Sequence, residues 1–240
     1  SGFGAYWSVT KWDDIIKIDT DPVTYSNEAG ITIAANRPDS QPSEIAPDGS
    51  KRTPEQMEEA KARGIQSLLS MDPPKHGMHR GAVSESVAPA NLNDLEPLIR
   101  ERIGVSLDGL PIGEEFDWVD LVSKDLTAMT LATLFNYPQE KRRQLTHWSD
   151  VLTTLPAPGR IVETIEEKDR ISLEFEAGMF QLLEQRKSEP AATDFISLMA
   201  HSPHVKDFSQ SEIRGDIGVL LIGGNDTTRN TLSGSVYALD

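Results

Sequence analysis

The last stretch of the sequence, Ser209 to Asp240, constrains the fold more than any other segment. It opens with a capping-box pattern, because Glu212 follows Ser209 by three positions, and no proline interrupts it. Apolar residues then recur at spacings of three and four, beginning with Ile213, Ile217 and Leu220. A single helix over this stretch would be about 48 Å long. We expect a helix of that length to cross the middle of a domain.

The same face of this helix loses volume in its second half. Gly223 and Gly224 lie mid-helix, where each costs about 1 kcal/mol relative to alanine, and Asp226 and Thr227 follow at once. Because protein interiors are close-packed, a buried stripe that turns small must face something that fills the space. An acid and an alcohol beside a bulky ligand are the parts of a proton relay. A helix crossing lined by small residues, with Asp226 as a cap at a break, explains the same pattern.

A second pattern follows the helix-start signal Asp72-Pro73-Pro74. His76 and Arg80 are four residues apart, which places them on one helical face in the first turns, where the helix dipole favours an anion. Arginine binds carboxylates and phosphates through its bidentate fork. The pattern therefore indicates an anion site, and the alternative is an exposed basic face that pairs with Asp72 and Glu85.

The rest of the chain is predicted to be mainly α with a little β near the N-terminus, in a single domain over residues 1–240. Short strands are expected at Tyr6–Thr10 and Gly30–Ala34, and the proline-rich segment 36–54 is expected to be a loop. Besides the terminal helix, apolar periodicity predicts helices over residues 12–19, 73–87, 92–107, 119–135, 140–154, 162–186 and 195–201.

Composition excludes several classes of protein. Lys and Arg number 23 against 38 Asp and Glu, so the net charge is −15 and nucleic acid is not an expected partner. The absence of cysteine excludes disulfides, zinc–thiolate sites and iron–sulfur clusters built by this chain. No apolar run approaches the roughly 20 residues that a bilayer requires. We therefore expect no membrane span and a cytoplasmic location.

Histidine spacing can indicate a metal site. The pairs His76-x-x-His79 and His201-x-x-His204 have ligand-like spacing, but proline interrupts the second and no glutamate flanks either as in zinc proteases. We therefore expect no metal-binding residue from this chain.

Together the two motifs resemble those of cytochromes P450, the haem-thiolate monooxygenases. Residues 71–80 resemble that family's C helix and residues 223–228 its I-helix signature, and segments 138–148, 162–186 and 195–201 fit its F, G and H helices. The resemblance implies an incomplete cytochrome P450 fold that runs from the B helix to the I helix. Several stretches are similar to the family's soluble bacterial alkane hydroxylases: 70–76, 88–92, 95–102, 132–135 and 223–230.

The resemblance also implies roles for particular residues. His76 and Arg80 would hold the propionates of heme b (iron protoporphyrin IX), while Gly223, Gly224 and Thr228 would lie against the cofactor. Asp226 and Thr227 would be the catalytic residues that deliver protons to O2, and Val219 and Ile222 would line the substrate side. The implied reaction is hydroxylation of an aliphatic substrate, at the terminal carbon of medium-chain alkanes or fatty acids. A ferredoxin and a ferredoxin reductase would supply the electrons.

Two family features that follow the I-helix signature are not found in this sequence: the cysteine ligand of the iron, and the later helix that carries Glu-x-x-Arg in that family. Both would follow Asp240, where the apolar spacing through Leu232 and Val236 is still running. We therefore expect an internal fragment that is inactive alone. The alternative outside this family is a non-catalytic all-α binding or scaffold protein.

Overall fold

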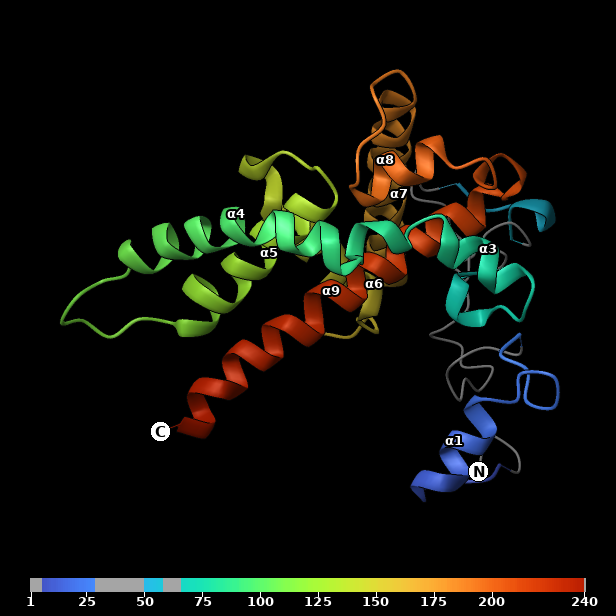
Figure 1. Cartoon of the computed structure of the whole chain (residues 1–240), viewed down its shortest axis with the longest axis horizontal. Helices are drawn as coiled ribbons and strands as arrows, with labels where there is room; N and C mark the ends of the chain where they lie inside the picture. Colours follow the sequence, from blue (N-terminus) through green and yellow to red (C-terminus); the bar gives the residue numbers. More distant parts are fainter. Residues whose placement is uncertain (1–5, 29–49, 58–65, 240) are drawn as a thin grey trace.

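The computed structural model describes residues 6–28, 50–57 and 66–239, and these ranges contain helices and no strand. Short helical segments connect the α-helices. Four of them are 3₁₀ helices, η2 Leu68–Ser70, η3 Ser84–Val87, η5 Gln139–Lys141 and η6 Val205–Asp207, and one is π-helical, η4 Val119–Lys124. The α-helices are α1 Trp12–Asp19, α3 Lys75–Gly81, α4 Pro89–Asp108, α5 Asp125–Leu134, α6 Arg142–Thr153, α7 Ile165–Lys187, α8 Phe195–His201 and α9 Gln210–Leu239 (Figure 1).

The mainly α prediction is confirmed, and the N-terminal strand prediction at Tyr6–Thr10 is wrong. That segment is irregular and exposed, and no strand lies in the described ranges to pair with it, as a strand would require. The second expected strand, Gly30–Ala34, lies outside the described residues. So does most of the expected loop 36–54.

Two of the expected helices are divided. The helix expected over 73–87 becomes α3 followed by η3, and two of the seven residues of α3 are Gly77 and Gly81, which are poor helix formers. The helix expected over 119–135 becomes η4 followed directly by α5. The other helices of the described ranges begin and end within a few residues of the expected positions.

The terminal segment forms one continuous helix, α9, as predicted. It crosses the molecule against η4, α5, α6 and α7, and Figure 1 shows it running diagonally through the assembly. Its Ile217 and Leu221 are fully buried in the same core as Trp148 of α6 and Phe175 of α7. The rings of Trp148 and Phe175 meet edge to face at 5.7 Å.

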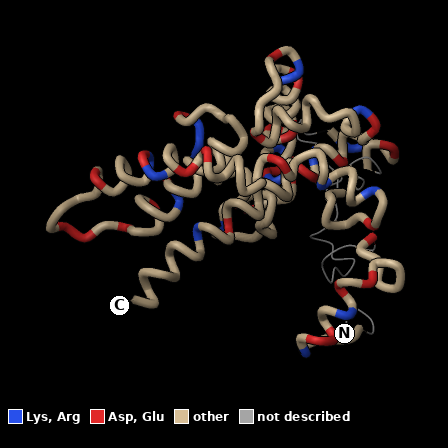
Figure 2. Tube along the Cα trace, in the orientation of Figure 1, with Lys and Arg blue, Asp and Glu red and all other residues tan. Residues whose placement is uncertain are grey.

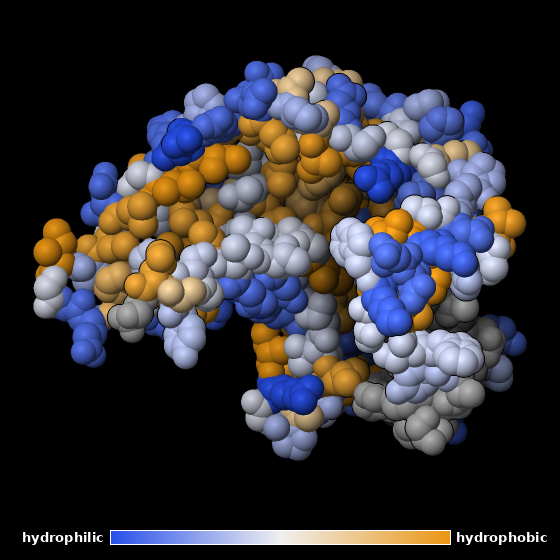
Figure 3. All heavy atoms as spheres, turned by 60° about the horizontal axis from the view of Figure 1, so that its bottom comes forward, coloured by the Kyte–Doolittle hydropathy of each residue, from blue (hydrophilic) through white to orange (hydrophobic). Residues whose placement is uncertain are grey.

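Burial along α9 stops partway. Every buried residue of the helix lies between Glu212 and Asn225, and Val236, Tyr237 and Leu239 are exposed. Residues 230–239 carry no charge, so the end of α9 is bare of acidic and basic side chains in Figure 2. Figure 3 shows hydrophobic side chains gathered in a hollow on one face of the molecule. Within the described part of the chain, no helix is both long and apolar enough to span a membrane.

Candidate functional site

The exposed side of α9 carries a ladder of hydroxyl groups. Thr227 Oγ1 donates to the Gly223 carbonyl at 2.5 Å, and Thr231 Oγ1 donates to the Thr227 carbonyl at 2.7 Å. Both threonines are exposed, and a Cβ added at Gly223 would meet no atom within 4 Å. Each hydroxyl proton is already donated to a backbone carbonyl. Toward any further partner, the two hydroxyl oxygens can therefore act only as hydrogen-bond acceptors. The face beside Gly223 is thus open and lined by hydrogen-bond acceptors.

Asp226 is held in a cluster of charges at the contact of α9 and α6. Arg229 Nη2 lies 2.7 Å from Asp226 Oδ1, and Arg229 Nη1 lies 2.8 Å from Asp150 Oδ1 on α6. Asn225 Nδ2 reaches both carboxylates, at 3.2 Å from Asp150 and 3.3 Å from Asp226. The carboxyl group expected to move protons is therefore paired with a cation and remains about one-third exposed, directly beside Thr227 in the chain.

The remaining α9 candidates differ in their surroundings. Gly224 faces α5, because a Cβ there would lie 2.7 Å from Leu131 Cδ2. The structure thus gives Gly224 the role of a close helix contact, which was the alternative explanation for this glycine. Thr228 is exposed, whereas Val219 and Ile222 are half-buried.

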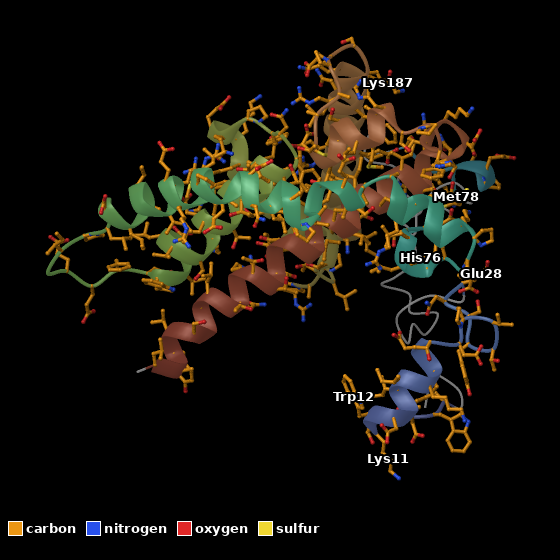
Figure 4. The ribbon with its side chains drawn as sticks, in the orientation of Figure 1. Lys11, Trp12, Glu28, His76, Met78 and Lys187 are labelled. Atoms are coloured by element: carbon orange, nitrogen blue, oxygen red, sulfur yellow. The ribbon has the colours of Figure 1, made fainter. Side chains whose placement is uncertain are left out.

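The α3 candidates lie on a short helix. His76 is half-buried and Arg80 is exposed (His76 is labelled in Figure 4). The Asp72 carboxylate, expected as a partner in the basic-face interpretation, instead accepts the Asn27 N–H at 3.0 Å. In the described part of the chain, Arg80 forms no ion pair with Glu85. Arg80 is therefore available to a ligand on the surface of α3.

Two side-chain pairs join α3 to the first turns of α9. Lys75 forms an ion pair with Glu212, and His79 Nδ1 lies 2.6 Å from Asp216 Oδ2. Asp216, Gly223 and Thr227 share one face of α9, since seven and eleven residues correspond to about two and three turns. The helix α3, which carries His76 and Arg80, therefore lies on the same side of α9 as the open face beside Gly223. Along the axis of α9, its contact at Asp216 comes about 10 Å before Gly223.

The sequence interpretation named His79 without its partner Asp216, and it assigned no role to Asp216, Asp150 or Arg229. A signal existed for Asp216, because it lies beside Ile213, Ile217 and Leu220 of the predicted apolar stripe, and a carboxylate buried there requires a partner. Burial raises the pKa of Asp216 above its ordinary value, although hydrogen bonds from His79 and the Leu68 backbone oppose the shift. At Glu212 burial acts in the same upward direction, but hydrogen bonds from Lys75 and Ser209 leave its pKa below the ordinary value.

Two of the four histidines considered as metal ligands, His79 and His201, have other partners. His79 contacts Asp216, and the two ring nitrogens of His201 lie 2.9 Å and 3.0 Å from the carbonyls of Ser197 and Glu189. Across the described ranges, no three His, Cys, Asp or Glu side chains gather in a way that could hold a metal ion.

Solved structures resemble this fold over the whole chain. CYP153D17 from a Sphingomonas species superimposes with a TM-score of 0.79 at 34% identity, covering 100% of this chain and 55% of that one. Cytochrome P450-153 from Novosphingobium aromaticivorans gives a TM-score of 0.79 at 33% identity, covering 100% of this chain and 55% of that one.

Curated relatives give the same picture from sequence. Linalool 8-monooxygenase of Pseudomonas putida is 26% identical over 98% of this chain and 54% of its own length. The methyl-branched lipid omega-hydroxylase of Mycobacterium tuberculosis is 24% identical over 98% of this chain and 50% of its own length. The chain thus spans about half the length of the curated relatives it matches. No protein-family model matches the chain.

Proposed function

Because the chain belongs to the cytochrome P450 family, we propose that the protein carrying these 240 residues is a haem-dependent monooxygenase. It inserts one oxygen atom of O2 into an aliphatic substrate. The open, acceptor-lined face of α9, next to a helix with an exposed arginine, supports this assignment. The non-catalytic scaffold alternative has no comparable support, since its helix contact accounts for Gly224 but not for the open face at Gly223.

The residues present fit one side of a bound haem. Empty space beside Gly223 admits a flat group against α9, and His76 and Arg80 suit its carboxylates. Haem, when bound, supplies the activation of O2 that amino-acid side chains cannot provide. The chain contains no cysteine, so it does not itself supply the thiolate ligand of the iron.

Within this site the chain's own residues orient and move protons. Thr227 Oγ1 donates to the Gly223 carbonyl and so accepts a hydrogen bond from whatever occupies the open face. Asp226 holds or releases a proton at Oδ1 or Oδ2, and Arg229 keeps the carboxylate oriented. The exposed third of Asp226 connects this relay to bulk water. Two electrons per turnover come from a ferredoxin and its reductase.

We further propose a linear aliphatic substrate, oxidised at its terminal carbon. Medium-chain alkanes and fatty acids are the candidates, and Val219 and Ile222 contribute apolar side chains to the substrate side. The similarity of segments 70–76 and 223–230 to bacterial alkane hydroxylases supports this choice. The name of the mycobacterial relative, an omega-hydroxylase of methyl-branched lipids, is consistent with terminal oxidation.

The exposed Thr227 hydroxyl beside the open Gly223 is the observation that carries this proposal. The test compares Thr227→Val with Thr231→Val in the complete, haem-loaded protein, because both hydroxyls donate to the carbonyl four residues earlier. We expect Thr227→Val to lower the product formed per electron pair by about tenfold, with release of peroxide, while Thr231→Val stays near wild type. An equal yield of product per electron pair in both variants would remove Thr227 from the proton relay. A complete protein that binds no haem would overturn the assignment.

A further inference from the structure

A buried histidine–aspartate pair joins α3 to α9 in a way the proposed reaction does not use. His79 and Asp216 are each 1% exposed, and their side chains meet at 2.6 Å across 137 positions of sequence. The other carboxylate oxygen of Asp216 accepts the Leu68 backbone N–H at 2.7 Å. One carboxylate therefore ties together three segments: η2, α3 and α9.

The imidazole of His79 is also fixed in its plane. Phe208 stacks on the ring with centroids 3.6 Å apart and an interplanar angle of 6°. His79 Nε2 is buried and has no hydrogen-bond partner among the described residues. Among the described residues, Nδ1 is therefore the ring nitrogen with a hydrogen-bond partner, Asp216 Oδ2 at 2.6 Å.

The helix that carries His79, α3, is too short to be stable without contacts to the rest of the molecule. It has seven residues, Lys75–Gly81, and two of these are glycine. Isolated helices shorter than about 12 residues are marginal in water, so contacts to the rest of the molecule decide how α3 is rotated about its axis. The Lys75–Glu212 pair lies at the start of α3 with Lys75 half exposed, so the buried contact in the last turn belongs to His79.

We propose that His79 and Asp216 are positioning residues for the haem-propionate site: their pair sets the rotation of α3 and thereby aims Arg80 and His76. The inference rests on the proposed haem-binding function. Arg80 follows His79 directly, and His76 precedes it by three positions, so a rotation of α3 that breaks the His79 contact also turns both anchors away. Neither His79 nor Asp216 needs to touch the cofactor for this effect.

The test measures the rate of haem transfer from the complete holoprotein to excess apomyoglobin. His79→Phe keeps an aromatic ring against Phe208 and removes the donor to Asp216, whereas His79→Asn keeps a donor near the Nδ1 position. We expect His79→Phe to speed haem loss by about tenfold and His79→Asn to stay within about threefold of wild type. If His79→Phe does not fold, Asp216→Asn serves instead, and we expect faster haem loss because the amide has one acceptor oxygen where the carboxylate uses two, one toward Leu68 and one toward His79.

A double-mutant cycle separates positioning from general destabilisation. If His79 acts through Arg80 and His76, His79→Phe adds less than about threefold to the haem loss of the His76→Ala/Arg80→Ala variant, in which both anchors are gone. Met179→Ala, which removes a buried side chain of α7 far in sequence from α3, is the control for lost stability alone. An undiminished effect of His79→Phe in the His76→Ala/Arg80→Ala variant overturns the inference, and so does equal haem loss in His79→Phe and Met179→Ala.

The same measurements distinguish failure of the proposed haem site from failure of the positioning role of His79. Unchanged haem loss in the His76→Ala/Arg80→Ala variant contradicts the propionate role of both anchors, and with it the positioning role of His79. Faster loss in that variant together with an undiminished His79→Phe effect leaves the haem site standing and removes only the positioning role of His79 and Asp216.

Discussion

Arg229 and Asp226 form an ion pair on one turn of α9, with 2.7 Å between Nη2 and Oδ1, and the same guanidinium reaches Asp150 on α6. Two carboxylates thus share one cation where the helices meet. The arrangement couples the orientation of the proposed proton donor to the packing of α6 against α9. It also means that the loss of Arg229 leaves two like charges close together.

We predict that Arg229→Gln lowers the free energy of unfolding of the complete protein by about 1–3 kcal/mol, because two partly buried carboxylates lose their partner. Urea unfolding at neutral pH measures the change. Arg100→Gln is the matched control, since Arg100 pairs with Glu96 on an exposed face and its loss should cost less than about 1 kcal/mol. Equal losses in the two variants would show that the Arg229 cluster is no stronger than a surface pair.

Gly223 and Gly224 are adjacent but should respond to alanine in opposite directions. A Cβ at Gly223 meets open space, so Gly223→Ala should raise the stability of the haem-free protein by up to about 1 kcal/mol through helix propensity. A Cβ at Gly224 lies 2.7 Å from Leu131 Cδ2, so Gly224→Ala should lower stability by about 1–3 kcal/mol. In the haem-loaded protein, Gly223→Ala should instead weaken haem retention. Stability curves with and without haem check both signs, and the same sign for both variants without haem contradicts the placement.

Gly215 is the site of a backbone approach between α9 and the segment before α3. A Cβ there would lie 2.1 Å from the Gln66 carbonyl oxygen and 2.6 Å from its carbon, and backbone atoms cannot rotate away. We predict that Gly215→Ala costs about 3 kcal/mol or more. Gly218→Ala, where a Cβ meets nothing within 4 Å, should be neutral or stabilising by up to about 1 kcal/mol. Thermal unfolding of the two variants provides the comparison, and a tolerated Gly215→Ala would mean that Gln66 does not press on α9.

The burial of Lys168 predicts that the stability of the fold depends on pH. Its ammonium donates to the carbonyls of Leu152 at 3.1 Å and Thr154 at 2.8 Å, where α6 ends, and burial lowers its pKa below 10.5 although Asp169 opposes the shift. On raising the pH, the folded state loses this proton before the unfolded state does. The unfolded state then binds more protons, so the contribution of Lys168 to stability rises with pH until 10.5.

Unfolding free energies of wild type, Lys168→Met and Lys168→Arg at pH values approaching 10.5 measure this slope. The difference between wild type and Lys168→Met should grow with pH. Lys168→Arg stays charged throughout and should show no such rise relative to Lys168→Met. If the difference in unfolding free energy between wild type and Lys168→Met stayed constant with pH, burial would not lower the pKa of Lys168.

Local signals in the sequence were sufficient for most of the helices. The cap at Ser209 and the absence of proline predicted a helix that the structure places at Gln210–Leu239. The helix expected to end at residue 135 ends at Leu134, and the backbone of Asn136 lies in the left-handed region at φ 48°. A strand, by contrast, requires a neighbour, which explains why weak alternation at Tyr6–Thr10 was misleading.

The partners within the candidate site could not be predicted in the same way. His79 and Asp216 meet across 137 positions, and Arg229 and Asp150 across 79, so no periodicity connects them. The sequence interpretation placed Asp226 and Thr227 in one relay because they are adjacent, but it contained nothing about the cation that holds Asp226. Pairings of this kind depend on how helices cross, which only the packed structure specifies.

The uneven burial of α9 has a consequence for its motion. Between Glu212 and Asn225 one side of the helix is buried against neighbouring side chains, and beyond Asn225 no described residue of α9 is buried. Amide hydrogens of the first part are protected by the cooperative core, whereas those of the later turns need only local fraying to exchange with deuterated solvent. Deuterium uptake in these 240 residues should therefore rise sharply after Asn225, and the hydroxyl ladder spans that boundary, with its first carbonyl on the slow side and its last threonine on the fast side.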